Sequence, residues 1–197
     1  MDPCESKSQL RHAIKERLDR LSAKDRSAES RSLCKRVLET VQKLEGPLTV
    51  CAFYPMGDEV DIQSLLTDLP ARGHVVYLPR KEGPHFVFRK MENVDALQPD
   101  DFGIPAPAQD SPLLEPGDLS VALIPGRAFD RKGNRLGRGN GGYDIWIRKQ
   151  RAQNPRTQFW SIAFECQVVQ DIPMEGHDEA VDCLITARGV QKTDSRV

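Results

Sequence analysis

The residues best suited to chemistry lie in one run, which reads IPGRAFDRKGNRLGRGNGGYD from Ile124 to Asp144. The run carries five glycines between Gly133 and Gly142. It also carries five basic side chains, which are Arg127, Arg131, Lys132, Arg135 and Arg138. Glycines let backbone N–H groups approach a ligand closely, and arginines bind phosphate oxygens in a planar fork. Because the run follows an apolar strand and leads into a helix N-terminus, it predicts a nucleotide or phosphoryl site.

Other motif families fit this run poorly. Gly137, Gly139 and Gly142 have the spacing G-x-G-x-x-G, but a dinucleotide fingerprint belongs in a tight turn directly after a strand. Here about a dozen polar residues separate the strand from the glycines. A Walker A loop would need G-K-[S/T], and a protein kinase would need H-R-D and D-F-G, which the sequence lacks. A flexible surface loop remains an alternative, although it leaves the joint occurrence of strand, arginines, glycines and Tyr143-Asp144 unexplained.

Several acidic residues have two interpretations. Asp144, in the first turn of the expected helix, can complement the helix dipole or ligate Mg²⁺, which prefers carboxylate oxygen. After an expected buried strand, Asp58 and Asp61 favour a turn and a helix cap. Glu59 has no such local role and is the better candidate for contacting a ligand.

The remaining candidates are weaker by themselves. Lys7 and Arg11 are four residues apart and share one helix face, for which a solvated charged surface is the simplest interpretation. His177-Asp178 precedes the last expected strand, where a lone histidine is more often a surface residue. The sequence shows neither G-x-S-x-G nor a Cys–His dyad, so it does not suggest covalent catalysis.

The elements that must position these residues follow from hydrophobic periodicity. Leu10, Ile14, Leu18 and Leu21 predict a helix over residues 7–21, and Ser22 is placed to cap a second helix. That second helix should bury Leu33, Val37, Val41 and Leu44. A third helix should follow Asp61 and end at Gly73, and a fourth should span residues 143–153. Apolar runs predict strands over residues 48–54, 74–78, 86–88, 119–124, 158–164 and 183–186, with a loop over residues 100–116 and a polar tail.

Strands that alternate with helices predict an α/β fold with an open, mostly parallel sheet. In such sheets ligands gather at the carboxyl ends of strands. The loops after Tyr54 and after Ile124 are therefore the expected binding loops. We expect a single domain over residues 1–197, with a frayed tail from about residue 189.

Composition limits the class of protein. The chain has 197 residues, 39% of them hydrophobic and 29% charged, with a net charge of −1, which argues against general nucleic-acid coating. No apolar run approaches the roughly 20 residues that span a membrane, and the first residues lack a signal segment. We expect a cytoplasmic monomer. The five cysteines, none in a C-x-x-C pair, are expected to be reduced: Cys4, Cys34, Cys51, Cys166 and Cys183.

The motifs together resemble a known family. Pro125-Gly-x-Ala-Phe-Asp130, followed by Gly133-x-Arg135-Leu-Gly137-x-Gly139-x-Gly141-x-Tyr143-Asp144, resembles 5-formyltetrahydrofolate cyclo-ligases, also called methenyltetrahydrofolate synthetases. Supporting pieces occur in family order: Lys7-x-x-Leu10-Arg11, Tyr54-Pro55 with Glu59-x-Asp61, Leu78-Pro-Arg80, Gly103-Ile-Pro-x-Pro107, and His177-Asp178 before Val181-Asp182. The resemblance extends over nearly the whole chain.

The resemblance implies an open sheet sandwiched by helices and an enzyme that uses ATP and Mg²⁺ to convert 5-formyltetrahydrofolate to 5,10-methenyltetrahydrofolate. Lys7 and Arg11 would hold ATP phosphates, and Lys7 and Arg138 would act in catalysis. Asp144 and Asp178 would ligate Mg²⁺. The nucleotide loop would consist of Arg135, Leu136, Gly137, Arg138, Gly139, Asn140, Gly141, Gly142 and Tyr143. The folate would be contacted by Tyr54, Glu59, Arg138, Gly139, Asn140, Gly141 and Gly142.

The implied reaction suits a chain without a nucleophile. ATP would phosphorylate the formyl oxygen, N10 of the folate would attack the formyl carbon, and phosphate would leave. The protein would have to align two substrates and neutralise phosphoryl charge. Gly142 stands where family members commonly carry tyrosine. This departure motivates two alternatives, which are a non-catalytic relative that binds nucleotide or folate, and an ATP-dependent enzyme acting on a different small amide.

Overall fold

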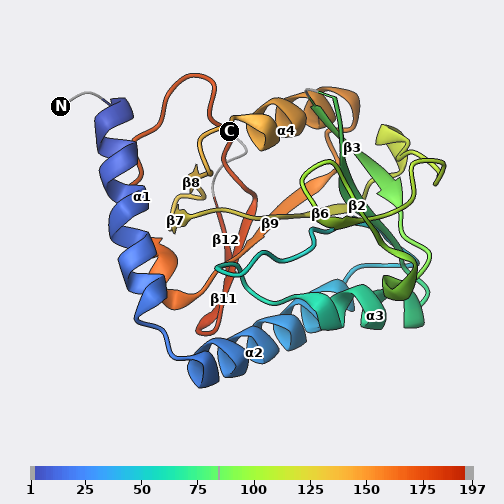
Figure 1. Cartoon of the computed structure of the whole chain (residues 1–197), viewed down its shortest axis with the longest axis horizontal. Coiled ribbons are helices and arrows are strands. Elements are labelled where there is room, and N and C mark those ends of the chain that lie inside the picture. Colours follow the sequence, from blue (N-terminus) through green and yellow to red (C-terminus); the bar gives the residue numbers. More distant parts are fainter. Residues whose placement is uncertain (1–2, 84, 194–197) are drawn as a thin grey trace.

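The computed structural model describes residues 3–83 and 85–193, which form an α/β structure in three layers (Figure 1). Within these residues there are four α-helices: α1 Pro3–Asp19, α2 Ala23–Val41, α3 Gln63–Ala71 and α4 Gly142–Gln153. The main sheet comprises β1 Thr49–Cys51, β2 Val75–Glu82, β3 His85–Lys90, β6 Val121–Ile124, β9 Gln158–Ile162, β11 Cys183–Thr186 and β12 Gly189–Lys192. Two small sheets are formed by β4 Gln98–Pro99 with β5 Pro105–Ala106, and by β7 Ala128–Asp130, β8 Arg135–Leu136 and β10 Val168–Val169. Single 3-10 turns are η1 Val94–Ala96, η2 Pro116–Asp118 and η3 Glu165–Gln167.

The main sheet has the strand order β12-β11-β9-β6-β1-β2-β3. Its five central strands are parallel, and the edge strands β3 and β12 are antiparallel to their neighbours. Val50 of β1 pairs with Val76 on one side and Val121 on the other. All four residues of β6 are buried, as expected for a strand covered on both faces. The predicted α/β fold with a mostly parallel sheet is confirmed.

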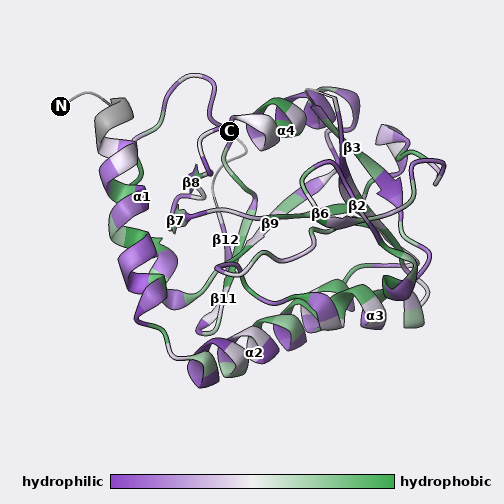
Figure 2. Ribbon diagram, in the orientation of Figure 1, coloured by the Kyte–Doolittle hydropathy of each residue, from purple (hydrophilic) through white to green (hydrophobic). Residues whose placement is uncertain are grey.

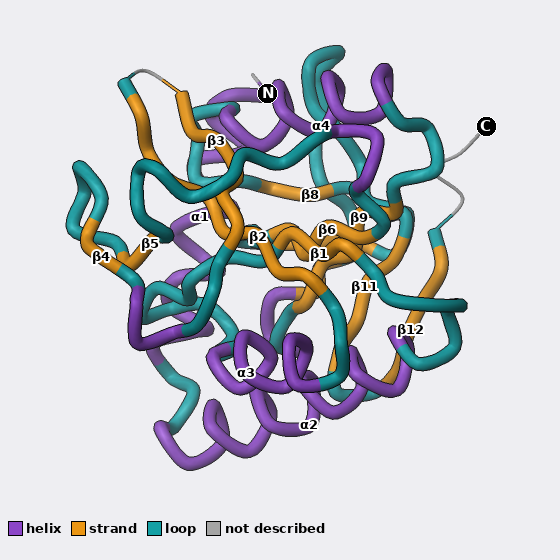
Figure 3. The backbone as a smooth tube through the Cα atoms, turned by 90° about the vertical axis from the view of Figure 1, so that its right-hand side faces the viewer, coloured by secondary structure: helices purple, strands orange, loops and turns teal. Residues whose placement is uncertain are grey.

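Helices cover both faces of this sheet (Figure 3). Helices α2 and α3 lie on one face and α4 on the other, while α1 stands beside the end of the sheet at which β6 leads into β7 (Figure 1). The hydrophobic parts of α2 and α3 turn toward the sheet (Figure 2), where Leu33 and Val37 are fully buried. The predicted cap of α2 is confirmed, because the Ser22 side chain accepts a hydrogen bond from the Asp25 N–H at 3.1 Å.

The carboxyl ends of the parallel strands point toward α1. Helix α1 contacts η3, which follows β9, and β7, which follows β6. Its inner face buries Ile14 and Leu18 against the main core, and this burial anchors α1 beside the loops at that end of the sheet. The N-terminal part of the helix, which carries Lys7 and Arg11, therefore lies within contact distance of those loops.

Four local predictions need correction. Residues 189–192, expected to fray, form β12 and pair with β11, while residues 194–197 lie outside the described residues. Helix α2 ends at Val41, so Leu44 packs against the core from a turn. The expected loop over residues 100–116 contains β5, which pairs with β4. The first part of the glycine-rich run is a paired hairpin, β7–β8. Among the described residues no helix has both the length and the apolar character needed to cross a bilayer.

Candidate active site

The two predicted binding loops meet because β1 and β6 are parallel neighbours. Arg138 donates hydrogen bonds to Asp58 at 2.8 Å and to Glu59 at 2.9 Å, so the run after β6 is joined to the turn after β1. Asp58 also pairs with Arg127, which places two guanidinium groups around one carboxylate. Burial and the neighbouring charge of Arg138 lower the pKa of Arg127. Asp58, expected only to favour a turn, is thus part of the charged cluster.

Glu59 is fixed within this cluster from both sides. Its Oε1 accepts from Arg138, and its Oε2 accepts from the Met56 N–H at 3.0 Å. Its side chain is only 8% exposed, which fits a carboxylate that is held in place for a ligand. Tyr54 lies on the same segment, and its hydroxyl is 3.3 Å from Gln63 Oε1.

The hairpin β7–β8 is organised by Asp130, whose carboxylate is fully buried. Its Oδ1 accepts from the N–H groups of Lys132 and Asn134, at 2.9 and 3.0 Å. Its Oδ2 accepts from the Asn134 side chain and from the Ile172 N–H. Gly133 closes the turn with φ of +90°, a conformation that favours glycine. This part of the motif therefore has a structural role.

Residues 137–142, here called the glycine loop, follow the hairpin and lead into α4. Arg138, Gly139 and Asn140 are exposed, and Gly141 caps α4 with φ of +65°. The Asn140 side chain accepts from the Gly142 N–H at 3.3 Å. Leu136, just before the loop, is 1% exposed, and its carbonyl accepts from the Arg127 N–H. The side chain of Leu136 is therefore not available to ATP.

Helix α1 supplies two cations to this region. Arg11 Nε donates to the Gly137 carbonyl at 2.9 Å, across 126 residues of sequence. Lys7, one turn earlier, is 6% exposed and pairs with Glu175 at 2.6 Å and Asp178 at 2.5 Å. A solvated charged face is therefore the wrong interpretation for Lys7.

The ion pair between Lys7 and Asp178 shifts the pKa of both residues. Burial disfavours the charge of Lys7, but hydrogen bonds and charges from Asp178 and Glu175 outweigh this effect and raise its pKa. Burial likewise opposes the charge of Asp178, but the hydrogen bond from Lys7 and another from the Glu175 N–H lower its pKa. Both groups are therefore charged at neutral pH.

Arg135 and Asp144, predicted to bind ATP and metal, contact each other. Their side chains form a buried ion pair at 2.6 Å, and Asp144 Oδ1 also accepts from the Glu179 N–H at 3.2 Å. Within the described residues, Arg135 Nε is buried without a hydrogen-bond partner. The pair ties the start of α4 to the hairpin, and Asp144 Oδ2 accepts no hydrogen bond from the described part of the chain.

The predicted metal ligand Asp178 belongs to a cluster that sequence reasoning found only in part. Ligand atoms of Glu175, His177 and Asp178 all lie within 4.8 Å of one another. Glu175 was not predicted, although it lies only three residues before Asp178. Asp144 is not a member of this group.

An aromatic cluster borders the end of the glycine loop at which α4 begins. The rings of Tyr143 and Phe86 have centroids 5.0 Å apart, and Phe88 and Trp146 lie behind them at 4.5 Å from each other. Burial and the charge of Glu59 raise the pKa of Tyr143, so the phenol stays protonated. Phe86 gave no signal in the sequence beyond membership of a strand.

Comparisons with known proteins identify the family of this chain. Residues 3–187 match the 5-formyltetrahydrofolate cyclo-ligase family. The chain belongs to this family. The mouse 5-formyltetrahydrofolate cyclo-ligase is 30% identical over 186 residues, which cover 90% of this chain and 91% of the mouse protein. The budding-yeast cyclo-ligase is 27% identical, over 93% of this chain and 96% of its own length.

Solved structures of family members have the same architecture. The 5,10-methenyltetrahydrofolate synthetase of Aquifex aeolicus superposes with a TM-score of 0.80 at 26% identity, over 95% of this chain and 93% of that one. The predicted family and the predicted class of enzyme, a cyclo-ligase, are confirmed.

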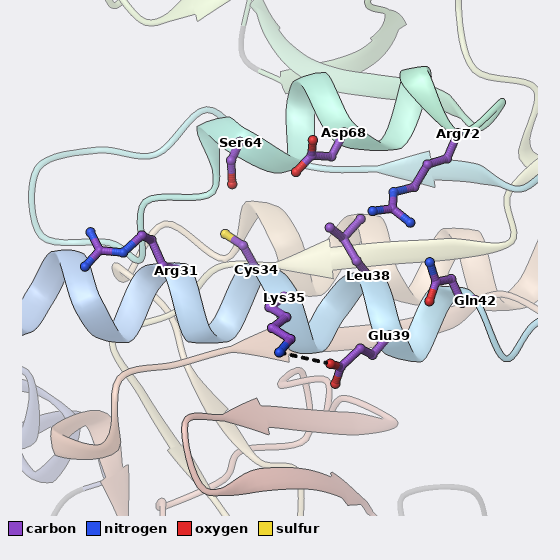
Figure 4. A pocket seen from close by; sticks show the side chains of 9 residues that line it. All are labelled: Arg31, Cys34, Lys35, Leu38, Glu39, Gln42, Ser64, Asp68 and Arg72. Atoms are coloured by element: carbon purple, nitrogen blue, oxygen red, sulfur yellow. Dashed lines mark ion pairs between the residues drawn. The ribbon is translucent and has the colours of Figure 1, made fainter.

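A separate groove of about 330 Å³ lies between α2 and α3 (Figure 4). Its lining comes from these two helices and the residue directly after each of them: Arg31, Cys34, Lys35, Leu38, Glu39, Gln42, Ser64, Asp68 and Arg72. None of these residues belongs to the glycine loop, α1 or α4. The groove is therefore not part of the candidate active site.

Proposed function

We propose that this protein catalyses the ATP- and Mg²⁺-dependent conversion of 5-formyltetrahydrofolate to 5,10-methenyltetrahydrofolate, with release of ADP and phosphate. The observation that carries the proposal is the contact between α1 and the glycine loop, in which Arg11 binds the Gly137 carbonyl and Lys7 lies buried one turn away. Cations from the first helix are thus brought to an exposed glycine- and arginine-rich loop at the carboxyl end of the sheet, a suitable place for a triphosphate.

The reaction requires activation of an amide oxygen. The formyl oxygen attacks the γ-phosphorus and ADP leaves, which gives an iminium phosphate. N10 then attacks the formyl carbon and gives up its proton to solvent, the bond between that carbon and the phosphorylated oxygen breaks, and inorganic phosphate departs. The chain needs no nucleophile for these steps. Its task is to align the two substrates and to present positive charge where the phosphoryl group transfers.

The ion pairs keep the catalytic cations in position before the substrates bind. Lys7 is held by Glu175 and Asp178, and Arg138 by Asp58 and Glu59. We propose that ATP phosphates replace the carboxylates as partners of Lys7, and that the glycine loop with Tyr143 surrounds the nucleotide. Glu59 released by Arg138 can accept hydrogen bonds from the amino and ring N–H groups of the pterin, with Tyr54 beside it.

The donor set fits Mg²⁺, which prefers carboxylate oxygens. Asp178 and Glu175 present carboxylates close together, and Asp144 has an oxygen that accepts no hydrogen bond from the described residues. We propose Asp144 and Asp178 as the ligands. Mg²⁺ bound there would neutralise charge on the ATP phosphates. The transfer of Lys7 to phosphate would leave Asp178 as a partly buried, unpaired charge, which a cation would compensate.

The proposal is tested by mixing protein, ATP, Mg²⁺ and 5-formyltetrahydrofolate and following the absorbance of the methenyl product. We expect product formation that requires ATP, with one ADP released for each product molecule. Tight folate binding without turnover would instead identify a non-catalytic relative. ADP release with another amide in a substrate panel, but not with 5-formyltetrahydrofolate, would identify an enzyme of different specificity.

We further propose a cytoplasmic monomer whose ligands are ATP and a reduced folate, and which uses neither nucleic acid nor a membrane. The four described cysteines, Cys34, Cys51, Cys166 and Cys183, are free thiols, which suits a reducing compartment. Burial raises the pKa of Cys51, Cys183 and Cys34, so these thiols are unreactive. The side chain of Cys4 lies outside the described residues. Light scattering at working concentrations tests the oligomeric state.

A further inference from the structure

Phe86 occupies the space beside Gly142 in which a side chain at that position would begin. A Cβ atom added to Gly142 would lie 3.2 Å from Phe86 Cε1, closer than ordinary contact. Phe86 comes from β3, at the edge of the main sheet, and so reaches the glycine loop from a distant part of the sequence. Gly142 itself begins α4 in a helical conformation that accepts any side chain. The ring of Phe86, and not backbone strain, is therefore what a larger residue at position 142 would meet.

The ring of Phe86 is held firmly but is not fully covered. It packs edge to face on Phe88 at 5.6 Å and against Tyr143 at 5.0 Å. Phe88 is 4% exposed, whereas Phe86 is only partly buried. An aromatic ring fixed from behind and open beside a ligand-binding loop can stack on a planar ring with little loss of conformational entropy.

The glycine loop has two chemically different ends. Near Gly137 and Gly139 it meets the guanidinium of Arg11, which suits phosphate. Near Gly142 it meets the rings of Phe86 and Tyr143. The aromatic end therefore suits a planar ring, while Glu59, which is placed to bind the pterin, contacts the loop between its two ends, at Arg138.

We propose that Phe86 is a specificity-determining residue, whose ring stacks on a planar ring of the reduced folate and takes the place of a side chain at position 142. This inference rests on the proposed cyclo-ligase function. It assigns the aromatic contact with the folate to β3 instead of to the glycine loop. It also explains how the site remains complete with glycine at position 142.

The test compares Phe86→Ala, Phe86→Leu and Phe86→Tyr. Phe86→Ala and Phe86→Leu should raise KM for 5-formyltetrahydrofolate about tenfold and leave KM for ATP within about twofold. Phe86→Tyr retains the ring and should keep KM near the wild-type value. An unchanged KM for the folate in Phe86→Ala, or a rise in KM for ATP in its place, would overturn the assignment.

A double variant tests whether an aromatic ring at position 142 can replace the ring at position 86. Gly142→Tyr alone should impair folate binding, because the new side chain meets Phe86. The combination of Gly142→Tyr with Phe86→Ala should bind the folate better than either single variant, since the aromatic ring has moved to the loop. A double variant no better than Phe86→Ala would contradict the inference. Thermal unfolding of each variant confirms that the fold is intact.

Binding is measured separately from turnover by titrating the protein with 5-formyltetrahydrofolate and following tryptophan fluorescence. Trp146 lies 6.5 Å from Phe86 and reports on this end of the loop. A wild type that binds the folate without turnover would refute the proposed function, while the effect of Phe86→Ala on Kd would still judge the role of Phe86. A wild type that does not bind the folate would refute both.

Discussion

The hairpin (residues 128–136) and the glycine loop (residues 137–142) are adjacent parts of one glycine- and arginine-rich run, and the structure treats them differently. In the hairpin Ala128, Phe129, Asp130, Arg135 and Leu136 are all buried. In the glycine loop Arg138, Gly139 and Asn140 are exposed, and the contacts come from α1, from the turn after β1 and from β3. The hairpin therefore fixes the geometry, and the loop that it supports is left free to contact ligands.

The largest expected effect is a loss of stability on substitution of Asp130, the buried carboxylate of the hairpin. Asp130→Ala removes the acceptor of four hydrogen bonds and leaves buried donors unpaired. We expect it to lower the free energy of unfolding by about 3 kcal/mol, measured by urea denaturation. Asp130→Asn keeps an acceptor for the Lys132 and Asn134 amides and should lose less. A loss below about 1 kcal/mol in Asp130→Ala would remove the structural role assigned to the hairpin.

Lys7→Met tests whether α1 contributes a catalytic cation beside the glycine loop. Loss of a positioned cation at the phosphoryl group should lower kcat/KM about 100-fold, or about 2.7 kcal/mol. Lys7→Arg retains the charge and should recover part of the rate. Because Lys7 is buried against Glu175 and Asp178, unfolding of both variants must be measured alongside. A folded Lys7→Met protein with wild-type kcat/KM would exclude Lys7 from catalysis.

In contrast to Asp130→Ala, Arg138→Ala should lower the reaction rate strongly and the stability only slightly. We expect at least a tenfold loss of rate, about 1.4 kcal/mol of barrier. Stability should change by less than about 1 kcal/mol, because the Arg138 side chain is 35% exposed and its ion pairs are screened. Arg131→Ala is the matched control, since Arg131 is an exposed arginine of the hairpin turn. Equal rates in the Arg138 and Arg131 variants would show that the loop arginine has no special role.

The smallest effect is expected for an ion pair that lies outside both the hairpin and the glycine loop. Glu82 and Arg89 form a 2.6 Å ion pair across the β2–β3 hairpin that carries Phe86. The hydrogen bond from Arg89 lowers the Glu82 pKa below its ordinary value of 4.5. The pair therefore stabilises the fold above that pH, and its contribution is lost as pH falls through the lowered pKa.

Glu82→Gln should accordingly cost at most about 1 kcal/mol at pH 7, and the difference from wild type should vanish at an acidic pH below the lowered pKa of Glu82. Urea denaturation at the two pH values measures it. A cost that persists in acid would point to packing of the side chain as the cause. A cost as large as that of Asp130→Ala would remove the distinction between buried and half-exposed carboxylates.

Sequence reasoning succeeded where the signal was local or periodic. The helices, the central strands and the meeting of the loops after Tyr54 and Ile124 follow from apolar spacing and from the rule for parallel sheets. Sequence reasoning failed where the same local pattern is compatible with either a solvated surface or a buried ion pair. Lys7 on a helix face looks solvated until Glu175 and Asp178, at the other end of the chain, cover it.

The sequence by itself determined the α/β class, the place of the binding run and the family, because periodicity and motif spacing are local properties of the chain. Only the tertiary structure decided that Arg135 pairs with Asp144, that Arg138 reaches Glu59, and that Phe86 fills the space at Gly142. Each of these contacts joins separate elements of the fold. Such contacts depend on how strands and helices are placed in space, and residue spacing along the chain carries no record of that placement.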